Sequence, residues 1–213
     1  MTYLQISTDR SIFAYMPSKS ERTRQFIIEK AAPVFNMRGY AATSMSDIME
    51  VTGLAKGGLY GHFESKDELA KESLKYCFDL LQLAIRERIR QKVTARDKLT
   101  EILHFYKNYS THPVIEGGCP LLNAAIDADD QWPILRDIAL KFMRESVTAL
   151  SHIIQQGIEH KEFNASIHAQ EEAENIFATI EGGIMMSKLS GSPKILNRIL
   201  DRIYQTVIHD FSI

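Results

Sequence analysis

Apolar residues recur along most of the chain at spacings of three and four, the period of an amphipathic α-helix. No stretch alternates for long with the period of two that indicates a strand, so the pattern predicts an all-α fold without a sheet. About nine helices are expected, separated by turns that contain Gly or Pro. Their expected ranges are 20–37, 44–52, 56–63, 66–93, 95–110, 119–127, 133–160, 168–189 and 193–211.

The stretch 43–66 stands apart, because two short helices follow each other there around a tight turn. Ser44 and Asp47 have the three-residue spacing of a capping box, which starts the first helix. Gly53 marks its end, since a residue without Cβ takes the turn conformation at low cost. Ser65 and Glu68 form a second capping box that opens the next helix. Helix, glycine turn and helix together are typical of a helix-turn-helix.

The second short helix has a composition that a purely structural helix would not need. Each glycine inside a helix costs about 0.5–1 kcal/mol relative to Ala, and this helix holds three: Gly57, Gly58 and Gly61. Small residues allow the backbone to approach another surface closely. A cation and two hydrogen-bond donors would suit a phosphate-rich surface: Lys56, Tyr60 and His62. A compact helical corner would explain the glycines alone, but the combination favours DNA.

The last two predicted helices, 168–189 and 193–211, are apolar on more than one face. A helix of this kind must be buried on two sides. One side then belongs to the domain core, and the other belongs either to the same monomeric bundle or to a second subunit. We favour a homodimer, with these residues in its interface: Ile180, Gly183, Ile184, Ile195, Ile199, Ile203, Tyr204 and Val207.

The composition is that of an ordinary soluble protein, with 45% hydrophobic and 24% charged residues. No apolar run approaches the roughly 20 residues that a membrane helix needs, so no membrane partner is expected. The first twenty residues lack the cationic start and long apolar stretch of a signal peptide. Two cysteines, Cys77 and Cys119, do not make a disulfide framework. Together these features predict a reduced, cytoplasmic location.

The charge distribution gives only weak support for a nucleic-acid partner. The formal net charge is −2, and residues 19–75 hold nine Lys or Arg against eight Asp or Glu. The amino-terminal part is therefore not basic in bulk. Any affinity for DNA must come from the local placement of a few cations and from a dimer that doubles them.

Enzymatic and metal-binding functions are not favoured. The chain has no G-x-S-x-G, H-E-x-x-H, P-loop or dinucleotide-binding motif. Asp127, Asp129 and Asp130 lack the regular spacing and later Glu of an EF-hand, so capping of the following helix explains them better. The seven histidines show no ligand spacing shared with Cys or carboxylates. We expect neither a cofactor nor a metal.

A series of residues in the amino-terminal part of the chain, in the same order, resembles the N-terminal domain of the tetracycline-repressor-like (TetR/AcrR) regulators. The resemblance covers about residues 22–75, and Ala55 departs from it, because the family often has Ser or Thr there. The matching positions are Ala31–Ala32, Phe35, Gly39–Tyr40, Thr43–Ser44, Ile48, Gly53–Leu54, the run from Lys56 to Phe63, and the run from Ser65 to Leu69. It implies a three-helix DNA-binding domain, a larger carboxy-terminal ligand-binding and dimerisation domain, and a four-helix dimer interface.

The expected organisation is a tail at 1–18, a DNA-binding domain at 19–66 and a ligand-binding and dimerisation domain at 67–213. The tail is either frayed or touches the DNA backbone or minor groove. The residues expected to face the major groove are Lys56, Gly57, Gly58, Tyr60 and Gly61. Phosphate contacts are expected from Thr43, His62 and Lys66, and Ser44 completes the expected DNA-binding set.

The carboxy-terminal helices are expected to enclose a pocket for a small apolar or aromatic effector. Its candidate residues are Phe78, Tyr106, Tyr109, Cys119, Asn123, Trp132, Phe142, Phe177 and Glu181. The predicted function is a homodimeric regulator that binds double-stranded, palindromic operator DNA as a repressor and leaves it when the effector binds. The alternative is an all-helical ligand-binding or interaction protein whose helix-turn-helix no longer binds DNA.

Overall fold

The computed structural model describes residues 18–107, 109–127 and 132–211, and within these ranges the chain is all-α without a strand. The expected all-α fold is therefore confirmed. The tail at 1–17 and the carboxylates of Asp129 and Asp130 lie outside the described residues. The helices are α1 (Lys19–Arg38), α2 (Met45–Thr52), α3 (Lys56–Tyr60), α4 (Lys66–Ile89), α5 (Ala95–Lys107), α6 (Pro120–Asp127), α7 (Pro133–Glu159), α8 (Ala169–Ser190) and α9 (Lys194–Gln205).

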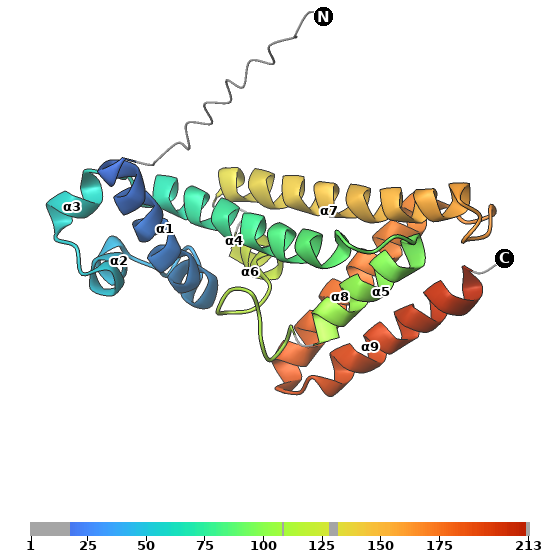
Figure 1. Cartoon of the computed structure of the whole chain (residues 1–213). Helices are drawn as coiled ribbons and strands as arrows, with labels where there is room; N and C mark the ends of the chain where they lie inside the picture. Colours follow the sequence, from blue (N-terminus) through green and yellow to red (C-terminus); the bar gives the residue numbers. More distant parts are fainter. Residues whose placement is uncertain (1–17, 108, 128–131, 212–213) are drawn as a thin grey trace, which may run out of the picture.

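The three amino-terminal helices lie together at one end of the molecule, and α8 and α9 lie toward the other (Figure 1). α4 leaves the amino-terminal helices and runs beside α7, so it belongs to both parts. It packs against α1 near its start and against α5, α6 and α7 farther on. A displacement of α4 would therefore move the amino-terminal helices relative to the rest of the protein.

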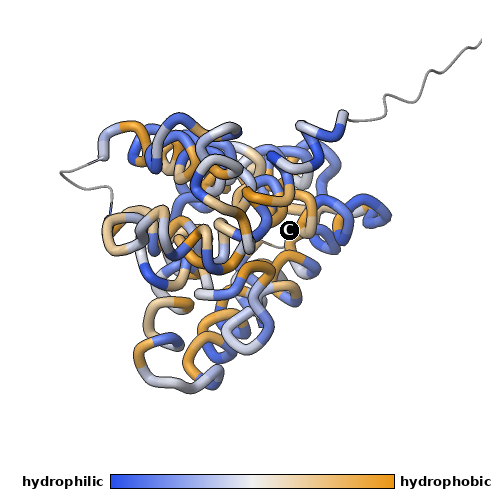
Figure 2. The backbone as a smooth tube through the Cα atoms, turned by 90° about the vertical axis from the view of Figure 1, so that its left-hand side faces the viewer, coloured by the Kyte–Doolittle hydropathy of each residue, from blue (hydrophilic) through white to orange (hydrophobic). Residues whose placement is uncertain are grey.

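A single buried cluster of apolar side chains runs through both parts of the chain. It includes Ile48 and Leu59 among the first helices and Leu103, Ile154 and Leu200 among the later ones. Along the tube in Figure 2, hydrophobic segments gather where helices face each other, and hydrophilic segments lie mainly outside. The segments on either side of residue 66 thus share this buried cluster, and the boundary expected there stays a prediction.

The carboxy-terminal half is a bundle in which α8 packs against both α7 and α9, and α5 packs against α7 and α9. The single helix expected over 193–211 has two parts: α9 ends at Gln205, and a short π-helix (Thr206–Asp210) follows. The wider turn still leaves Val207 fully buried. No described helix is both long enough and apolar enough to cross a membrane.

Candidate nucleic-acid interface

The helix-turn-helix begins with a well-formed cap on α2. The Ser44 hydroxyl accepts a hydrogen bond from the backbone N–H of Asp47 at 3.2 Å, and the Asp47 carboxylate accepts one from the backbone N–H of Ser44 at 2.7 Å. This is the capping box that the sequence predicts. After α2, Gly53 takes the left-handed conformation at φ +68°, which reverses the chain toward α3.

α3 is held to the body by two apolar side chains. Leu59 and Phe63 are both buried, and Arg24 of α1 places its guanidinium 4.4 Å from the centre of the Phe63 ring. Because these anchors lie on one side, the opposite side of α3 faces solvent. Ala55, the N-cap residue, makes no side-chain capping bond, as its lack of a hydroxyl requires.

The solvent-facing side of α3 contains all five residues expected at the major groove. All five are exposed: Lys56, Gly57, Gly58 and Tyr60 belong to α3, and Gly61 directly follows it. Tyr60 keeps 43% of its surface exposed, and the Lys56 ammonium lies 5.8 Å from its ring centre. The absence of side chains at the three glycines leaves the helix backbone open beside this Tyr–Lys pair, which permits close approach to a groove.

The flanking residues have more mixed roles than the sequence indicates. Thr43 is only 1% exposed, and its hydroxyl donates to the backbone oxygen of Gly39 at 2.7 Å. This arrangement contradicts the phosphate contact expected for Thr43, since the side chain instead closes the turn after α1. Ser44 is exposed, and its hydroxyl is engaged in the cap of α2.

Lys66 and His62 lie at the junction between α3 and α4. The Lys66 ammonium donates to the backbone oxygen of Ala41 at 2.9 Å and lies 5.1 Å from the ring centre of Trp132, just before α7. Lys66 therefore connects the helix-turn-helix to the carboxy-terminal part, and a phosphate would have to compete with these contacts. His62 is half-buried beside the exposed face of α3.

Two arginines near this surface are neutralised by carboxylates. Arg24 pairs with Glu68 at 2.9 Å and Arg38 pairs with Asp47 at 2.7 Å. The pKa of Asp47 is lowered by hydrogen bonds from Ser44 and then by Arg38, and that of Glu68 is lowered by the backbone N–H of Glu64 and then by Arg24. Both carboxylates thus stay charged at neutral pH.

Lys19, Arg22 and Lys56 are exposed and form no ion pair within the described ranges, so these cations remain available to an anionic partner. Lys19 and Arg22 begin α1, and Lys56 begins α3. The bulk charge of residues 19–75 is nevertheless modest, so one copy of this surface has only a weak positive field.

A cavity of about 480 Å³ lies between α4, α5, α7 and α8. Three of the expected pocket residues line it, namely Tyr106, Phe142 and Phe177. Phe78 does not, because its ring stacks against Phe142 at 4.0 Å and supports the cavity from behind. Trp132 does not line this cavity either, since it lies beside Lys66 just before α7.

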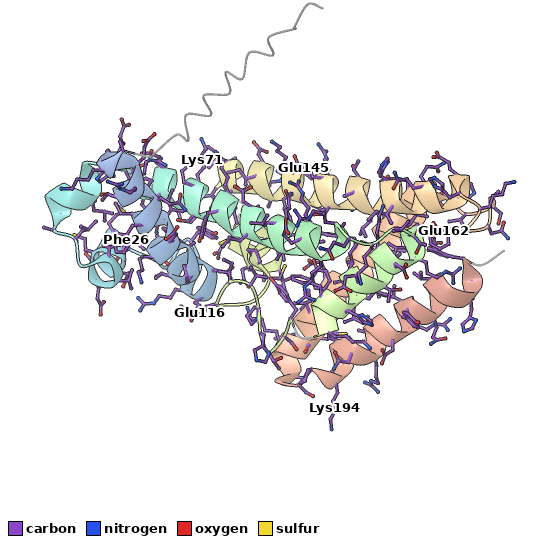
Figure 3. The ribbon with its side chains drawn as sticks, in the orientation of Figure 1. Phe26, Lys71, Glu116, Glu145, Glu162 and Lys194 are labelled. Carbon is purple, nitrogen blue, oxygen red and sulfur yellow. The ribbon has the colours of Figure 1, made fainter. Side chains whose placement is uncertain are left out.

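The sequence prediction missed the polar residues of this cavity. Asp79, Gln82 and Arg86 of α4 and Lys141 and Glu145 of α7 line it. Their spacing along α4 is three and four, which puts them on one helix face and gives a signal that was present in the sequence. Figure 3 labels Glu145 on α7; its carboxylate accepts a bond from the Gln82 amide at 3.4 Å.

Cys119 and Glu181, both expected in the pocket, form a buried pair with each other instead. The Cys119 thiol donates to Glu181 Oε2 at 3.1 Å, which ties the start of α6 to α8. Burial raises the pKa of both groups, and the Glu181 charge raises that of Cys119 further. Tyr109 lies near them, and burial followed by the charge on Cys119 raises its pKa.

Asn123, another expected pocket residue, joins three helices. Its amide donates to the backbone oxygen of Asn36 at 2.9 Å and to Asn36 Oδ1 at 3.0 Å, while Lys188 of α8 donates to Asn123 Oδ1 at 2.9 Å. Asn36 in turn donates to the backbone oxygen of Glu116, which lies beside the end of α1 in Figure 3. These bonds link α1 to α8 through α6.

Five of the eight residues expected in a dimer interface are already buried inside one chain. The apolar side chains of Ile180, Ile184, Ile203 and Val207 all face its core. A Cβ on Gly183 would come within 2.9 Å of Leu196, so Gly183 permits close packing of α8 on α9 of the same chain. Packing within one chain therefore explains the burial of these five positions without a second subunit, and their place in a dimer interface stays a prediction.

The free apolar surface of these helices lies elsewhere. Ile195, Ile199 and Tyr204 of α9 are half-buried. On α8, Met185, Met186 and Leu189 are exposed, Leu189 by 81%. These side chains leave apolar surface open on α8 and α9 of a single chain.

The fold and the exposed face of α3 together define an all-helical DNA-binding regulator, and comparisons with known proteins identify its family. Residues 27–72 match "Bacterial regulatory proteins, tetR family", and residues 95–203 match "Tetracyclin repressor-like, C-terminal domain". The chain belongs to the TetR family of transcriptional regulators.

Individual relatives agree over nearly the whole chain. A TetR-family transcriptional regulator from Cytophaga hutchinsonii is 32% identical with a TM-score of 0.86, covering 93% of this chain and 99% of that one. The transcriptional repressor DhaR of Mycobacterium sp. strain GP1 is 24% identical, covering 87% of this chain and 92% of its own length. CifR, solved with a 26-base-pair operator duplex, shares the fold at 22% identity and a TM-score of 0.76, over 90% and 98% of the two chains.

Proposed function

We propose that the protein is a homodimeric repressor that leaves a palindromic operator when a small apolar or aromatic effector binds its carboxy-terminal part. As a DNA-binding regulator it would act in the cytoplasm. Support for repression comes from the similarity to DhaR, a transcriptional repressor. The observation that carries the proposal is the exposed Lys–Gly–Gly–Tyr–Gly face of α3, held outward by Leu59 and Phe63.

In this proposal α3 enters the major groove. The glycines let its backbone approach the base edges, Tyr60 supplies a hydroxyl and a ring, and Lys56 supplies a cation beside them. Lys19 and Arg22, at the start of α1, contact the phosphate backbone. Backbone contacts of this kind fix position, and contacts to base edges supply sequence preference.

Two copies would bind together through α8 and α9. The exposed row Met185, Met186 and Leu189 and the half-buried Ile195 and Ile199 supply the apolar surface for a twofold interface. Twofold symmetry of the protein requires a palindromic site whose half-sites lie about one DNA turn apart. A second copy also doubles the unpaired cations Lys19, Arg22 and Lys56, which compensates for the low charge of a single DNA-binding domain.

The effector would act through α4, which lines the cavity with one end and supports the helix-turn-helix with the other. A molecule between α4 and α7 shifts the protein toward states in which the two α3 helices of the dimer no longer match the spacing of the operator half-sites. The effector must bind these states more tightly, and typical coupling free energies are about 1–3 kcal/mol.

An electrophoretic mobility shift with the promoter region of the protein's own gene tests this function. A retarded band that weakens as salt rises, and that is lost in the Tyr60→Ala variant, is the expected result. No retardation at any salt concentration, with neighbouring intergenic DNA included, would instead favour an interaction protein with an inactive helix-turn-helix.

A further inference from the structure

The cavity between α4 and α7 separates apolar from charged groups by depth. Its buried wall consists of aliphatic and aromatic side chains from α5, α7 and α8: Ile102, Tyr106, Phe142, Leu150, Ile153 and Ile180. No ionised side chain belongs to this buried wall in the part of the chain that the structure describes. A molecule that fills the inner cavity must therefore be apolar over most of its surface.

The charged groups of the cavity stand at its mouth and balance one another. Asp79 and Arg86 of α4 and Lys141 and Glu145 of α7 are all exposed. Two are acidic and two are basic, so the mouth selects neither anions nor cations. Gln82 bridges the two helices there, since it donates to Glu145 at 3.4 Å and accepts from Arg86 at 3.2 Å.

One polar group of the inner wall lacks a partner. Tyr106 is 7% exposed, yet its hydroxyl forms no hydrogen bond with any described residue. Unlike the Tyr109 hydroxyl, the Tyr106 hydroxyl is not fully enclosed, so it can be reached from the cavity. The hydroxyl thus offers the lining a single point at which a bound molecule gains a directed hydrogen bond.

We propose that this cavity binds an uncharged, largely apolar ring compound that carries one hydrogen-bonding group, which pairs with the Tyr106 hydroxyl. The ring packs among Phe142, Phe177 and the isoleucines, and the volume suits a molecule of one to three rings. This proposal rests on the proposed function only for the effect of the ligand on DNA; binding itself follows from the cavity.

Charged molecules are excluded by the same chemistry. An ion moved into the inner cavity loses its hydration without gaining a counter-charge, and that loss is large. Near the inner wall, Glu181 is an acid that could attract a cation, since it acts electrostatically on Tyr106. It is not part of the cavity wall, however, and it already accepts the hydrogen bond of Cys119. If a cation bound more tightly than neutral or anionic molecules, the hydrogen bond between Cys119 and Glu181 would have to open to expose the carboxylate.

The test uses N-phenyl-1-naphthylamine, an uncharged dye whose fluorescence rises in apolar surroundings, bound to the full-length protein. Three competitors with one ring system then displace it: 2-naphthalenemethanol, 2-naphthoate and 2-naphthylmethylammonium. The alcohol is expected to displace the dye at a concentration at least about 10-fold lower than either ion. Equal or stronger displacement by either ion overturns the proposal, and so does a failure of the dye to bind.

The Tyr106 hydrogen bond is tested by comparing 2-naphthalenemethanol with 2-methylnaphthalene, which lacks the hydroxyl. In the natural protein this bond is expected to raise the affinity for the alcohol about 2- to 12-fold relative to the hydrocarbon, beyond any general effect of polarity. Tyr106→Phe should abolish that gain and leave the hydrocarbon unaffected. Tyr109→Phe is the matched control, because the Tyr109 hydroxyl is fully enclosed without a partner and lies outside this cavity.

A gain that persists in Tyr106→Phe, or that is lost equally in Tyr109→Phe, contradicts the assigned role of Tyr106. The same protein samples are assayed for promoter DNA in the mobility shift. Loss of DNA binding with intact selectivity for the neutral alcohol would refute the proposed function alone. Retained DNA binding without that selectivity would refute the ligand class alone.

Discussion

The side-chain amide of Asn123 donates hydrogen bonds to both oxygens of Asn36, at 2.9 Å to the backbone carbonyl and 3.0 Å to Oδ1. Asn36 belongs to α1 and is 2% exposed, and Asn123 belongs to α6. Lys188 holds Asn123 from the side of α8. The amino-terminal helices are therefore connected to α8 through α6, in addition to their contact with α4.

The first prediction concerns this α1–α6–α8 connection. Asn123→Ala should lower the free energy of unfolding by about 1–3 kcal/mol, because the buried oxygens of Asn36 lose their donor. Urea denaturation followed by circular dichroism measures this. Gln155→Ala is the matched control: its amide bonds only to Glu159 on the surface of the same helix, and its loss should cost under about 0.5 kcal/mol. Similar costs for the two variants would show that the connection is not a stabilising one.

The second prediction concerns the exposed face of α3. Lys56→Ala and Tyr60→Ala should each weaken DNA binding by at least about 10-fold without changing the melting temperature, because neither side chain is buried. Lys56→Ala should also reduce the slope of log affinity against log salt. Fluorescence anisotropy with labelled duplex measures both quantities.

Lys75→Ala serves as the control for this face, since Lys75 is exposed on α4 and pairs with Glu72. It removes the same charge from a helix outside the proposed groove contact. If Lys75→Ala weakens binding as much as Lys56→Ala, the effect reflects net charge, and α3 has no special role.

The third prediction concerns the apolar row on α8. Leu189→Asp should convert the dimer into monomers at micromolar concentration, because a carboxylate would be placed in an apolar interface. Sedimentation velocity gives the mass. Leu83→Asp is the control, as Leu83 is an exposed leucine of α4. A dimer that survives Leu189→Asp but not Leu83→Asp would place the interface on α4.

The fourth prediction follows from the raised pKa of Glu181, whose first cause is burial. The folded protein favours the protonated carboxyl, so this group's contribution to stability is present below its unfolded pKa, about 4.5. It is lost as the pH rises through the folded pKa. Glu181→Gln keeps an oxygen to accept from Cys119 and removes the charge. At pH 8 it should raise the melting temperature by roughly 2–4 °C, as about 1 kcal/mol does in a chain of this size.

At pH 4.5 and below, the same substitution should leave the melting temperature nearly unchanged. Glu171→Gln, on the exposed first turn of α8, is the comparison variant and should show no comparable gain at pH 8. A Glu181→Gln protein that is less stable at pH 8 would mean that the carboxylate is charged and favourably paired in the fold.

The helices and the exposed face of α3 could be predicted from the sequence because both depend on local signals. Spacing predicts the helices, and the caps at Ser44 and Ser65 and the turn at Gly53 place α2, α3 and α4 to within a few residues. The glycines of α3 stand out because they are costly in a helix. Once Leu59 and Phe63 are recognised as the buried anchors, the exposure of these glycines follows.

The ligand cavity and the dimer surface could not be predicted as well, because they depend on how helices pack. Periodicity shows that Ile184 or Phe78 is buried, but it does not show whether its partner is the same chain, a ligand or a second copy. Polar residues such as Asn123 and Cys119 look like ligand contacts in a sequence, yet here each one bonds to another part of the chain. Thr43 is a similar case, since its hydroxyl closes a turn.

Selection from a pool of random-sequence DNA duplexes tests the central claim, that paired copies of α3 read DNA, most directly. The natural protein is expected to enrich a palindrome whose half-sites lie about one DNA turn apart, with its sequence preference lost in Tyr60→Ala and its affinity reduced in Leu189→Asp. Enrichment of no sequence, or of the same sequence by the natural protein and Tyr60→Ala alike, would contradict the account.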